Sequence, residues 1–344
     1  MTSSTHLFTP YTLRGITVRN RLWVSPMCQY SVFAEDGVPT DWHLVHLGSR
    51  AVGGAGLVLA EATAVEPRGR ISAQDLGLWN EAQAEAFGPI VRFVADHGAT
   101  PAIQIAHAGR KAGVPGKMGP SPLAFSPEMG VPMAAAADDL RAVVEAFRAA
   151  AERAEQAGFQ VVEIHAAHGY LLHEFLSPVS NRRSDVYGGS LENRARLLLE
   201  VVRAVRSVWP ERLPLFVRIS ATDWLPGVAS WDVEQSVALA NWLKVEGVDL
   251  IDVSSGGLSA DQQITLEPGY QVPFAERIKR EAGIAVAAVG LITEARQADV
   301  IVREGRADAV LVARQSLRDP YWPLRVAREL GVEMAVPFQY RRAW

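Results

Sequence analysis

Two histidines and a tyrosine stand close together in the stretch EIHAAHGYLLHEFLSP, residues 163–178. His165 and His168 are three residues apart, and Tyr170 follows two residues after the second. Two imidazole N–H groups can hold a carbonyl oxygen and stabilise the negative charge that develops on it. A phenol, with an ordinary pKa near 10, suits protonation of a strongly basic enolate-like carbon and is a poor acid for most hydrolyses. The stretch therefore predicts reduction of a carbon–carbon double bond conjugated to a carbonyl.

Two other interpretations of these histidines remain open. Either residue alone is most simply a structural histidine whose ring nitrogens are satisfied by neighbouring groups. A His-x-x-His pair can also bind a metal, and His107 could join it in a metal-dependent hydrolase. We expect no metal, because the first predicted strand lacks a second ligand pair. In addition, no carboxylate falls in a ligand-like position at the ends of the fourth to eighth predicted strands.

The predicted reduction also needs a hydride, which no side chain can supply, so the sequence implies a cofactor. Arg314 comes just after the last predicted strand and Gly290 after the one before it, where barrels commonly bind phosphate. A phosphate-bearing cofactor fits this position, although Arg314 could equally be a surface ion-pair residue. The strand ends carry no pair of Asp or Glu, which argues against glycoside hydrolysis by paired carboxylates.

Eight short apolar or β-branched runs recur along the chain, and each has the composition of a buried parallel strand. They are residues 21–27, 56–63, 100–107, 159–167, 213–220, 250–257, 284–292 and 307–314. Amphipathic segments predicted as helices lie between them, at 81–97, 138–157, 190–206, 231–246, 270–282 and 293–304. This alternation predicts an α/β fold, a (β/α)₈ TIM barrel, rather than an open doubly wound sheet, and no glycine-rich dinucleotide turn occurs.

We expect a single domain, residues 1–344, with three segments added to the barrel. Residues 7–20 carry a turn around Arg14 and Gly15 and predict a β-hairpin that caps the barrel. Residues 108–137 are a long Gly/Pro-rich connection after the third strand, and structureless loops of that length usually serve as active-site lids. The tail PFQYRRAW, residues 337–344, should dock against protein because its aromatic residues would be unfavourably exposed.

Composition favours a small-molecule partner. The formal net charge of −4 and the pI near 6.1 give no basic excess for nucleic acid and no Lys/Arg block for an anionic membrane surface. Cys28 is the only cysteine, which excludes an intrachain disulfide and suits a reducing compartment. The amino-terminal stretch MTSSTHLF lacks a charged region followed by an apolar region. We therefore expect the protein in the cytoplasm.

Four segments of the sequence carry a resemblance to a known family: LFTPYTLRGITVRNRLWVSPMCQYS, QIAHAGRKA, HAAHGYLLHEFLSPVSNRRSDVYGGSLENRARLL and PFQYRRAW. The chain resembles the old yellow enzymes, FMN-dependent ene-reductases, and within them the thermophilic-like class. The resemblance covers nearly the whole chain. It implies tightly bound, non-covalent FMN, NADPH or NADH as reductant, enones and related activated alkenes as substrates, and a homo-oligomer that is a dimer or a dimer of dimers.

The resemblance also assigns flavin contacts to ten positions, which are Ser25, Pro26, Met27, Cys28, Ala60, Gln104, Arg218, Gly290, Ala313 and Arg314. Gln104 would donate to and accept from the pyrimidine edge of the flavin. Arg218 would stabilise the reduced ring, and Arg314 with neighbouring backbone amides would hold the phosphate. Ala313 departs from the glycine that the family often has, which adds one methyl group beside the phosphate.

In the implied reaction, His165, His168 and Tyr30 would contact the substrate, and Tyr170 would protonate the α-carbon after hydride transfer from flavin N5. Cys28 would tune the flavin potential, unless it is a small buried hydrophobe. Arg342 would reach into the active site of a neighbouring protomer, unless the tail docks on its own chain. A flavin-binding protein with a sensing or structural role would share every flavin contact but would not need Tyr170.

Overall fold

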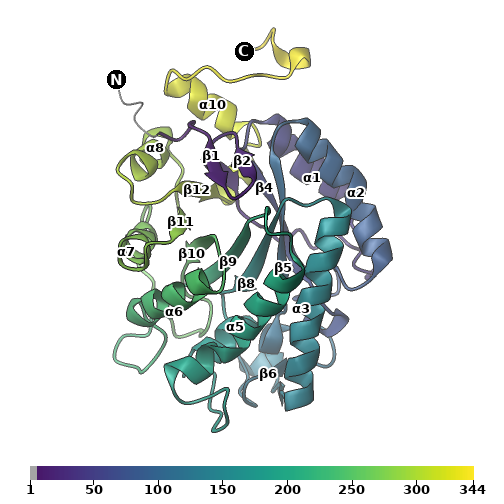
Figure 1. Cartoon of the computed structure of the whole chain (residues 1–344), viewed down its shortest axis with the longest axis vertical. Helices are drawn as coiled ribbons and strands as arrows, with labels where there is room; N and C mark the ends of the chain where they lie inside the picture. The colour runs from purple at the N-terminus through teal and green to yellow at the C-terminus, as the bar shows by residue number, and fades with distance from the viewer. Residues whose placement is uncertain (1–5) are drawn as a thin grey trace.

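Eight parallel strands form a closed barrel in the computed structural model, which describes residues 6–344 (Figure 1). The ring closes where β12 pairs with β3. The strands are β3 (Leu22–Val24), β4 (Leu57–Ala64), β5 (Thr100–Ala106), β8 (Val161–Ala166), β9 (Leu215–Ser220), β10 (Leu250–Ser254), β11 (Ala285–Ala288) and β12 (Ala309–Val312). Each coincides with one of the eight predicted runs, so the predicted (β/α)₈ barrel is confirmed. Residues 1–5 of the stretch MTSSTHLF lie outside the described residues.

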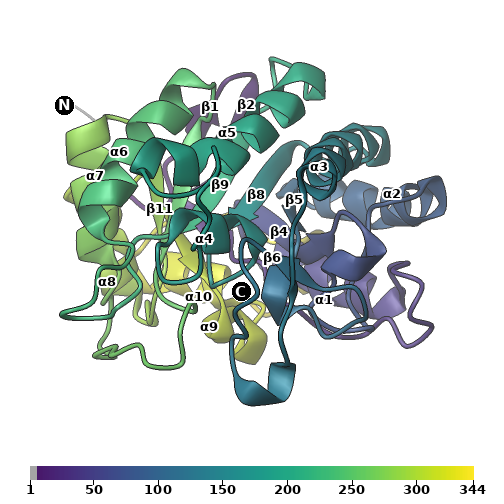
Figure 2. The ribbon, with the colours of Figure 1, turned by 90° about the horizontal axis from the view of Figure 1, so that it is seen from below.

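Helices surround the barrel, as two perpendicular views show (Figures 1 and 2). Six coincide with the predicted segments: α2 (Glu81–Asp96), α3 (Ala137–Ala157), α5 (Leu191–Val208), α6 (Val233–Val245), α7 (Val272–Ala282) and α8 (Ala295–Arg303). Local chemistry fixes their ends. The Asn80 side chain accepts from the Gln83 backbone N–H at the start of α2, and Gly158 ends α3 with a φ of +92°.

Four further helices in the described chain have no counterpart among the predicted segments. They are α1 (Asp41–Val52), α4 (Leu171–Leu176), α9 (Arg314–Arg318) and α10 (Trp322–Glu329). The helices α4 and α9 are too short to display a helical period in the sequence. None of the helices within residues 6–344 combines the length and apolar character needed to cross a bilayer.

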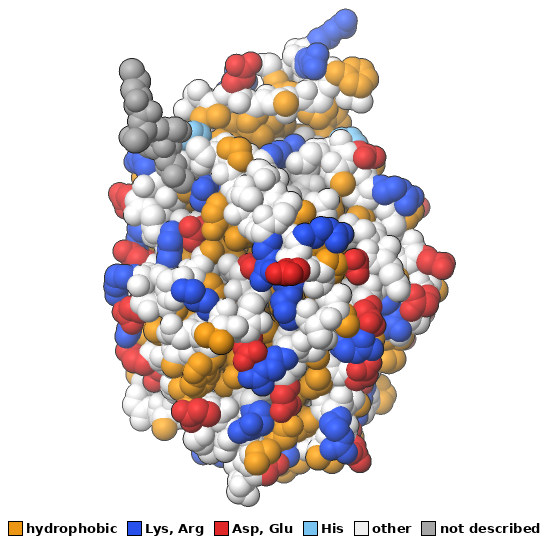
Figure 3. All heavy atoms as spheres, viewed as in Figure 1, with side chains coloured by type: hydrophobic (Ala, Val, Ile, Leu, Met, Phe, Trp, Pro, Cys, Tyr) orange, Lys and Arg blue, Asp and Glu red, His pale blue; other side chains and the backbone are white. Residues whose placement is uncertain are grey.

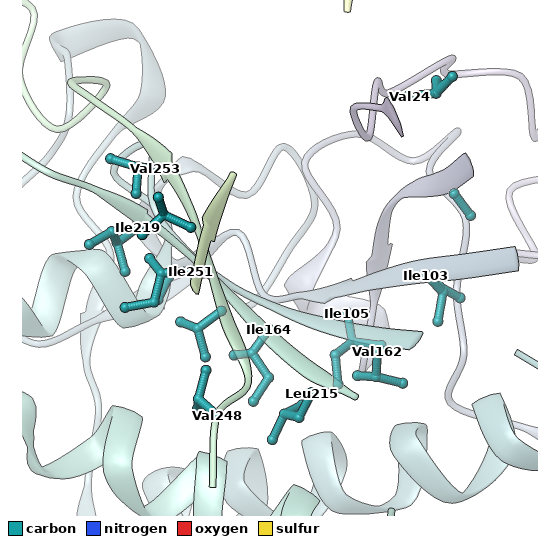
Figure 4. Packing of buried hydrophobic residues seen from close by; sticks show 14 of the residues in the cluster. Val24, Ile103, Ile105, Val162, Ile164, Leu215, Ile219, Val248, Ile251 and Val253 are labelled. Carbon is teal, nitrogen blue, oxygen red and sulfur yellow. The ribbon is translucent and has the colours of Figure 1, made fainter. Parts of the chain in front are cut away.

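Buried apolar side chains form two layers on either side of the strands. In the outer layer, Val162, Ile164 and Leu215 lie between the strands and the helices (Figure 4). In the inner layer, Trp23 and Phe216 stack inside the barrel, with ring centroids 5.9 Å apart and planes 12° from parallel. Burial on both faces explains why the strands read as continuous apolar runs rather than as an alternating pattern.

The predicted hairpin consists of β1 (Tyr11–Leu13) and β2 (Ile16–Val18), which pair antiparallel. At its turn, Arg14 has a φ of +49°, its Nε lies 2.6 Å from Asp249 Oδ1, and the Gly15 N–H donates to the Arg212 carbonyl at 2.8 Å. Arg212 and Asp249 precede β9 and β10, so the hairpin closes the amino end of the barrel. Capping by this hairpin is confirmed.

The long connection after β5 is present at residues 108–137, but it is not structureless. It contains 3₁₀ turns at Gly109–Lys111 and Pro127–Met129 and two short strands, β6 (Met118–Gly119) and β7 (Met133–Ala134), which pair with each other. The Arg183 guanidinium adds a hydrogen bond to the Ala135 carbonyl at 2.7 Å. These bonds satisfy backbone groups that a free loop would leave to water, which corrects the prediction of a structureless loop.

The carboxyl-terminal tail extends past α10, away from the barrel (Figure 1). The tail contains one 3₁₀ turn, at Phe338–Tyr340. The Tyr340 ring packs edge-on against Tyr321 with centroids 6.0 Å apart, and Trp344 lines a small pocket of about 190 Å³ beside α10. Phe338 is nevertheless 73% exposed.

On the face shown in Figure 3, basic and acidic side chains are interspersed.

Candidate active site

The candidate active site lies at the carboxyl ends of β8, β9 and β10. His165, near the end of β8, is the register partner of Arg218 on β9, and Arg218 is the register partner of Asp252 on β10. His168 and Tyr170 follow β8 in the turn before α4. Barrels of this kind place their chemistry at this end. The structure therefore brings the two histidines and the tyrosine together.

The two histidines form a contiguous pair of neutral rings. Their rings lie edge to face, with His168 Nδ1 3.4 Å from His165 Nε2. His165 Nδ1 accepts from the Ala167 N–H at 3.2 Å, so the proton of this ring lies on Nε2. His168 Nε2 lies 2.8 Å from Ser254 Oγ. Burial and then the positive charge of Arg218 hold the pKa of both rings well below the usual range.

Tyr170 packs against this pair with its phenol protonated. Its ring lies edge-on to His165, with centroids 5.0 Å apart. Burial is the main cause that raises the pKa of Tyr170 far above its usual value. The Lys111 ammonium lies 5.2 Å from the Tyr170 ring centroid and 4.3 Å from that of Phe125. Burial lowers the pKa of Lys111 to about 8. Lys111 and Phe125 belong to the 108–137 segment, which therefore reaches the site.

A cavity of about 270 Å³ is lined in part by Ser254, whose hydroxyl contacts His168. The predicted residues that line it are Arg218, Gly290, Ala313 and Arg314. Gly290 has a φ of +121°, a conformation that residues with a side chain rarely adopt, and a Cβ there would also meet the Gln271 side chain at 2.8 Å, so the position favours glycine. A wider depression of about 770 Å³ around Trp224 and Trp231 contains none of the predicted site residues.

Two buried polar contacts lie inside the barrel, near this cavity. Gln104 Nε2 donates to Glu163 Oε1 at 2.8 Å, which leaves Gln104 Oε1 and one N–H for a ligand. Arg218 Nε lies 3.0 Å from Asp252 Oδ2. A fixed amide and a fixed guanidinium next to a glycine cradle suit a planar ring with donor and acceptor edges and an attached phosphate. These residues fit FMN.

The segment after β3 supplies the remaining predicted flavin contacts. The Ser25 N–H donates to the Val312 carbonyl at 2.9 Å, and Ser25 Oγ is buried with no hydrogen-bond partner among the described residues. An orphaned hydroxyl of this kind requires an explanation, and a ligand would provide one. Pro26 and Met27 are half-buried beside it. Ala60 is buried on β4, where the pairing register with β5 shifts.

Cys28 and Tyr30 lie together at the outer side of this segment. The Cys28 thiol is half-buried, and burial followed by the nearby Glu61 carboxyl raises its pKa, so it is a thiol rather than a thiolate. Glu61 Oε1 accepts from the Gln29 N–H at 3.0 Å. Burial, followed by the Cys28 and Asp75 charges, raises the pKa of Tyr30 to about 12, although the residue is 46% exposed.

Two predicted residues stand apart from this constellation. His107 Nε2 lies 2.7 Å from Glu66 Oε1, and His107 Nδ1 accepts from the Gly109 N–H. Within residues 6–344 there is no cluster of three or more His, Cys, Asp or Glu side chains placed to hold a metal ion. Arg342 is exposed on the tail, and within the part of the chain that the structure describes no hydrogen bond or ion pair attaches it to the site.

Several residues of the site had only weak signals in the sequence. Ser254 ends β10 and was visible as a strand-end serine. Gln271 lines the cavity from the distant end of the β10–α7 connection, where its Oε1 accepts from Ser255 Oγ at 2.6 Å. Glu163 lies two residues before His165, on the same face of β8, and the period of two along a strand could have indicated it.

The fold and the pocket define a class: a barrel oxidoreductase that holds a phosphate-bearing flavin at the carboxyl ends of its strands. The family model described as "NADH:flavin oxidoreductase / NADH oxidase family" matches residues 6–333. The chain is 51% identical over 341 residues to an NADPH dehydrogenase of Geobacillus sp. (strain WCH70), covering 99% of both chains. It therefore belongs to this family.

Solved structures agree with this assignment. Morphinone reductase is 30% identical with a TM-score of 0.80, over 97% of this chain and 92% of that one. The old yellow enzyme homologue from Zymomonas mobilis is 26% identical with a TM-score of 0.81, over 96% and 94%. The protein is an FMN-dependent NADPH oxidoreductase of the old yellow enzyme family.

Proposed function

We propose that this oxidoreductase reduces the carbon–carbon double bond of α,β-unsaturated carbonyl compounds, with Tyr170 as the proton donor. The observation that carries the proposal is the arrangement of two neutral histidines edge-on to a protonated phenol. Because a neutral imidazole carries no charge, it can donate a hydrogen bond to a carbonyl oxygen in a buried site without needing a counter-ion there. The phenol keeps its proton until a basic carbon forms beside it.

The chain's own residues divide the work of holding the cofactor and the substrate. We propose that Ser25, Pro26, Met27, Ala60, Gln104, Arg218, Gly290, Ala313 and Arg314 hold FMN and that Cys28 tunes its potential. The chemistry that bound FMN supplies is hydride acceptance from NADPH and hydride delivery to the β-carbon of the alkene. Arg218 carries the positive charge that offsets negative charge gained by the ring.

The substrate would lie between the flavin and the histidine pair. His165 Nε2–H and His168 would hold the carbonyl oxygen, and Tyr30 would border the open side. Tyr170 would give its proton to the α-carbon and regain one from water. Lys111 supports a role for residues 108–137 as the active-site segment, because its ammonium lies over the rings of both Tyr170 and Phe125.

Exposed apolar side chains support a homo-oligomer. Phe33 is 82% exposed and Trp42 is 52% exposed, on the segment that follows β3 and on α1. Such side chains are unfavourable in water unless another chain covers them. We propose that the tail of one protomer docks there and brings Arg342 to the neighbouring site.

The single cysteine supports a cytoplasmic location.

An anaerobic spectrum tests the function directly. Holoprotein should show an oxidised flavin spectrum, bleach on addition of NADPH, and recover its colour on addition of 2-cyclohexenone. The saturated ketone cyclohexanone, which has the same carbonyl but no double bond, should leave the flavin bleached. If the bleached flavin regains its colour in air but not on addition of any enone, the protein is an NADPH dehydrogenase without ene-reductase activity, and the proposal is refuted.

A further inference from the structure

Two buried carboxyl groups share one arginine inside the barrel, below the cofactor pocket. Glu163 on β8 and Asp252 on β10 are both fully buried, and Arg218 stands on β9 between their strands. The register pairs Gln104 with Glu163 and Arg218 with Asp252. Gln104 Nε2 donates to Glu163 Oε1 at 2.8 Å, and Arg218 Nε lies 3.0 Å from Asp252 Oδ2, so two buried polar contacts lie side by side on four adjacent strands.

The hydrogen bonding of this layer is incomplete. Among residues 6–344, Glu163 Oε2 and both oxygens of Asp252 are buried without a hydrogen-bond partner, and Arg218 Nε lies close to Asp252 Oδ2 without a hydrogen bond to it. One guanidinium cannot neutralise two carboxylates that are removed from water. Like charges at close range prevent both carboxyls from ionising together.

The charged and titratable neighbours of Glu163 are few. Arg218 faces it from β9 and Asp252 from β10, while Gln104 from β5 is uncharged. His165, farther along β8, is neutral because its pKa is lowered. Burial, followed by the Asp252 charge, raises the pKa of Glu163 to about 8, and burial raises the pKa of Asp252 to about 6. Glu163 is therefore the carboxyl that keeps a proton at neutral pH.

We propose that Glu163 and Asp252 hold one proton between them and act as a positioning pair that sets the reduction potential of the bound flavin. This inference rests on the proposed function, in which Gln104 and Arg218 contact the flavin ring. With one proton, the two carboxyls and the guanidinium are neutral as a group. Without it, the group carries one negative charge, which opposes the addition of electrons to the ring.

The proton balance is simple. An external reductant supplies two electrons to the flavin, and the carboxyl pair makes no bond to it. Where the pair has lost its proton, the negative charge gained by the ring raises the proton affinity of the pair, and one proton enters from solvent. Reduction of the native protein should therefore take up one more proton than reduction of Glu163→Gln, over an interval that begins near pH 8.

The test is a redox titration of holoprotein against a reference dye at several pH values. Near pH 6 the equilibrium constants of the native and Glu163→Gln proteins should agree within about threefold. Above pH 8 the constant of the native protein should fall up to about tenfold more per pH unit, which corresponds to about 30 mV for a two-electron couple. Glu174→Gln is the matched control, because Glu174 is equally buried but contacts Arg110 rather than Arg218.

The possible outcomes separate this inference from the proposed function. Native and Glu163→Gln curves that run parallel at every pH would overturn the shared proton. A protein that binds flavin and titrates as expected but leaves enones unreduced would overturn the proposed function alone. If Glu163→Gln does not fold, the infrared difference between reduced and oxidised native protein above pH 8 must show a new protonated carboxyl band, and its absence would overturn the inference.

Discussion

The two ends of the barrel are built from the same strands, yet they treat their polar groups differently. At the amino end, Arg14, Arg19 and Arg21 each donate to backbone carbonyls of distant segments, and Trp23 Nε1 donates to the Asn20 carbonyl at 2.8 Å. At the carboxyl end, Ser25 Oγ, Glu163 Oε2 and both carboxyl oxygens of Asp252 lack hydrogen-bond partners within the described chain. The polar groups named at the amino end are hydrogen-bonded within the protein, whereas those named at the carboxyl end remain available to bind a ligand.

The backbone shows the same contrast. Six non-glycine residues of the described chain have a positive φ, and five of them lie in connections after the carboxyl ends of strands: Tyr30, Glu35, His168, Trp224 and Leu291. The sixth, Arg14, forms the hairpin turn. Unfavourable backbone conformations persist only where the surrounding structure enforces them, and they concentrate at functional sites. The comparison indicates that one end mainly supplies stability and the other mainly chemistry.

The largest expected effect is a loss of stability from the amino end. Trp23→Ala removes a fully buried ring stacked on Phe216 and should lower the free energy of unfolding by about 3–5 kcal/mol. Urea denaturation measures this loss, with Val245→Ala on the exposed surface as a control expected to change it by less than about 0.5 kcal/mol. Enone turnover by the folded variant should be unchanged, and a large change would mean that the two ends are coupled.

The converse effect is expected from Tyr170→Phe at the carboxyl end. The oxidative half-reaction with an enone should slow by about 10²-fold or more, because only this step needs the proton donor. Flavin reduction by NADPH and the urea midpoint should both stay close to their native values. Stopped-flow traces of the two half-reactions decide the matter, and an unchanged enone step would mean that water or another residue supplies the proton.

A smaller effect is expected when the carbonyl donors are removed. The double variant His165→Ala, His168→Ala should bind phenolate ligands at least about 10-fold more weakly, since each hydrogen bond to a charged group contributes roughly 1.5–3 kcal/mol. Titration of the long-wavelength charge-transfer band between the phenolate and the flavin gives the affinity. His97→Ala, just after the end of α2, is the control. If the double variant keeps the native band and affinity, the carbonyl site lies elsewhere.

A further effect, which builds up gradually with pH, concerns the pH dependence of stability. Burial raises the pKa of Glu174 to about 8, so the folded apoprotein keeps a proton that the unfolded chain releases above about pH 4.5. Stability should therefore fall as pH rises from about 4.5 to 8, by up to about 1.4 kcal/mol per pH unit for this group. In Glu174→Gln this contribution should vanish, so its urea midpoint should decline less between pH 5.5 and 7.5. Equal slopes would show that Glu174 is ionised in the fold.

The sequence predicted the barrel and the histidine–tyrosine group for related reasons. Strands buried on both faces leave continuous apolar runs, and His165, His168 and Tyr170 are close in the sequence as well as in space. Gln271 could not be found in this way. Its position at the cavity depends on the path of the long connection between β10 and α7, which no sequence pattern reveals. The incomplete bonding of Glu163 and Asp252 depends on the register of three strands, which the sequence of any one strand does not contain.

The closure of the ring also constrains how the chain can fold. β3 completes its pairing only with β12, and Arg21 Nη1 reaches the Asp308 carbonyl across 287 residues of sequence. Contacts so distant in sequence carry a large loop-closure cost and form slowly. During synthesis, the apolar inner faces of the first strands remain without their final neighbours until almost the whole chain has emerged. A nascent chain of this protein therefore depends on protection from aggregation longer than one whose first strands pair locally.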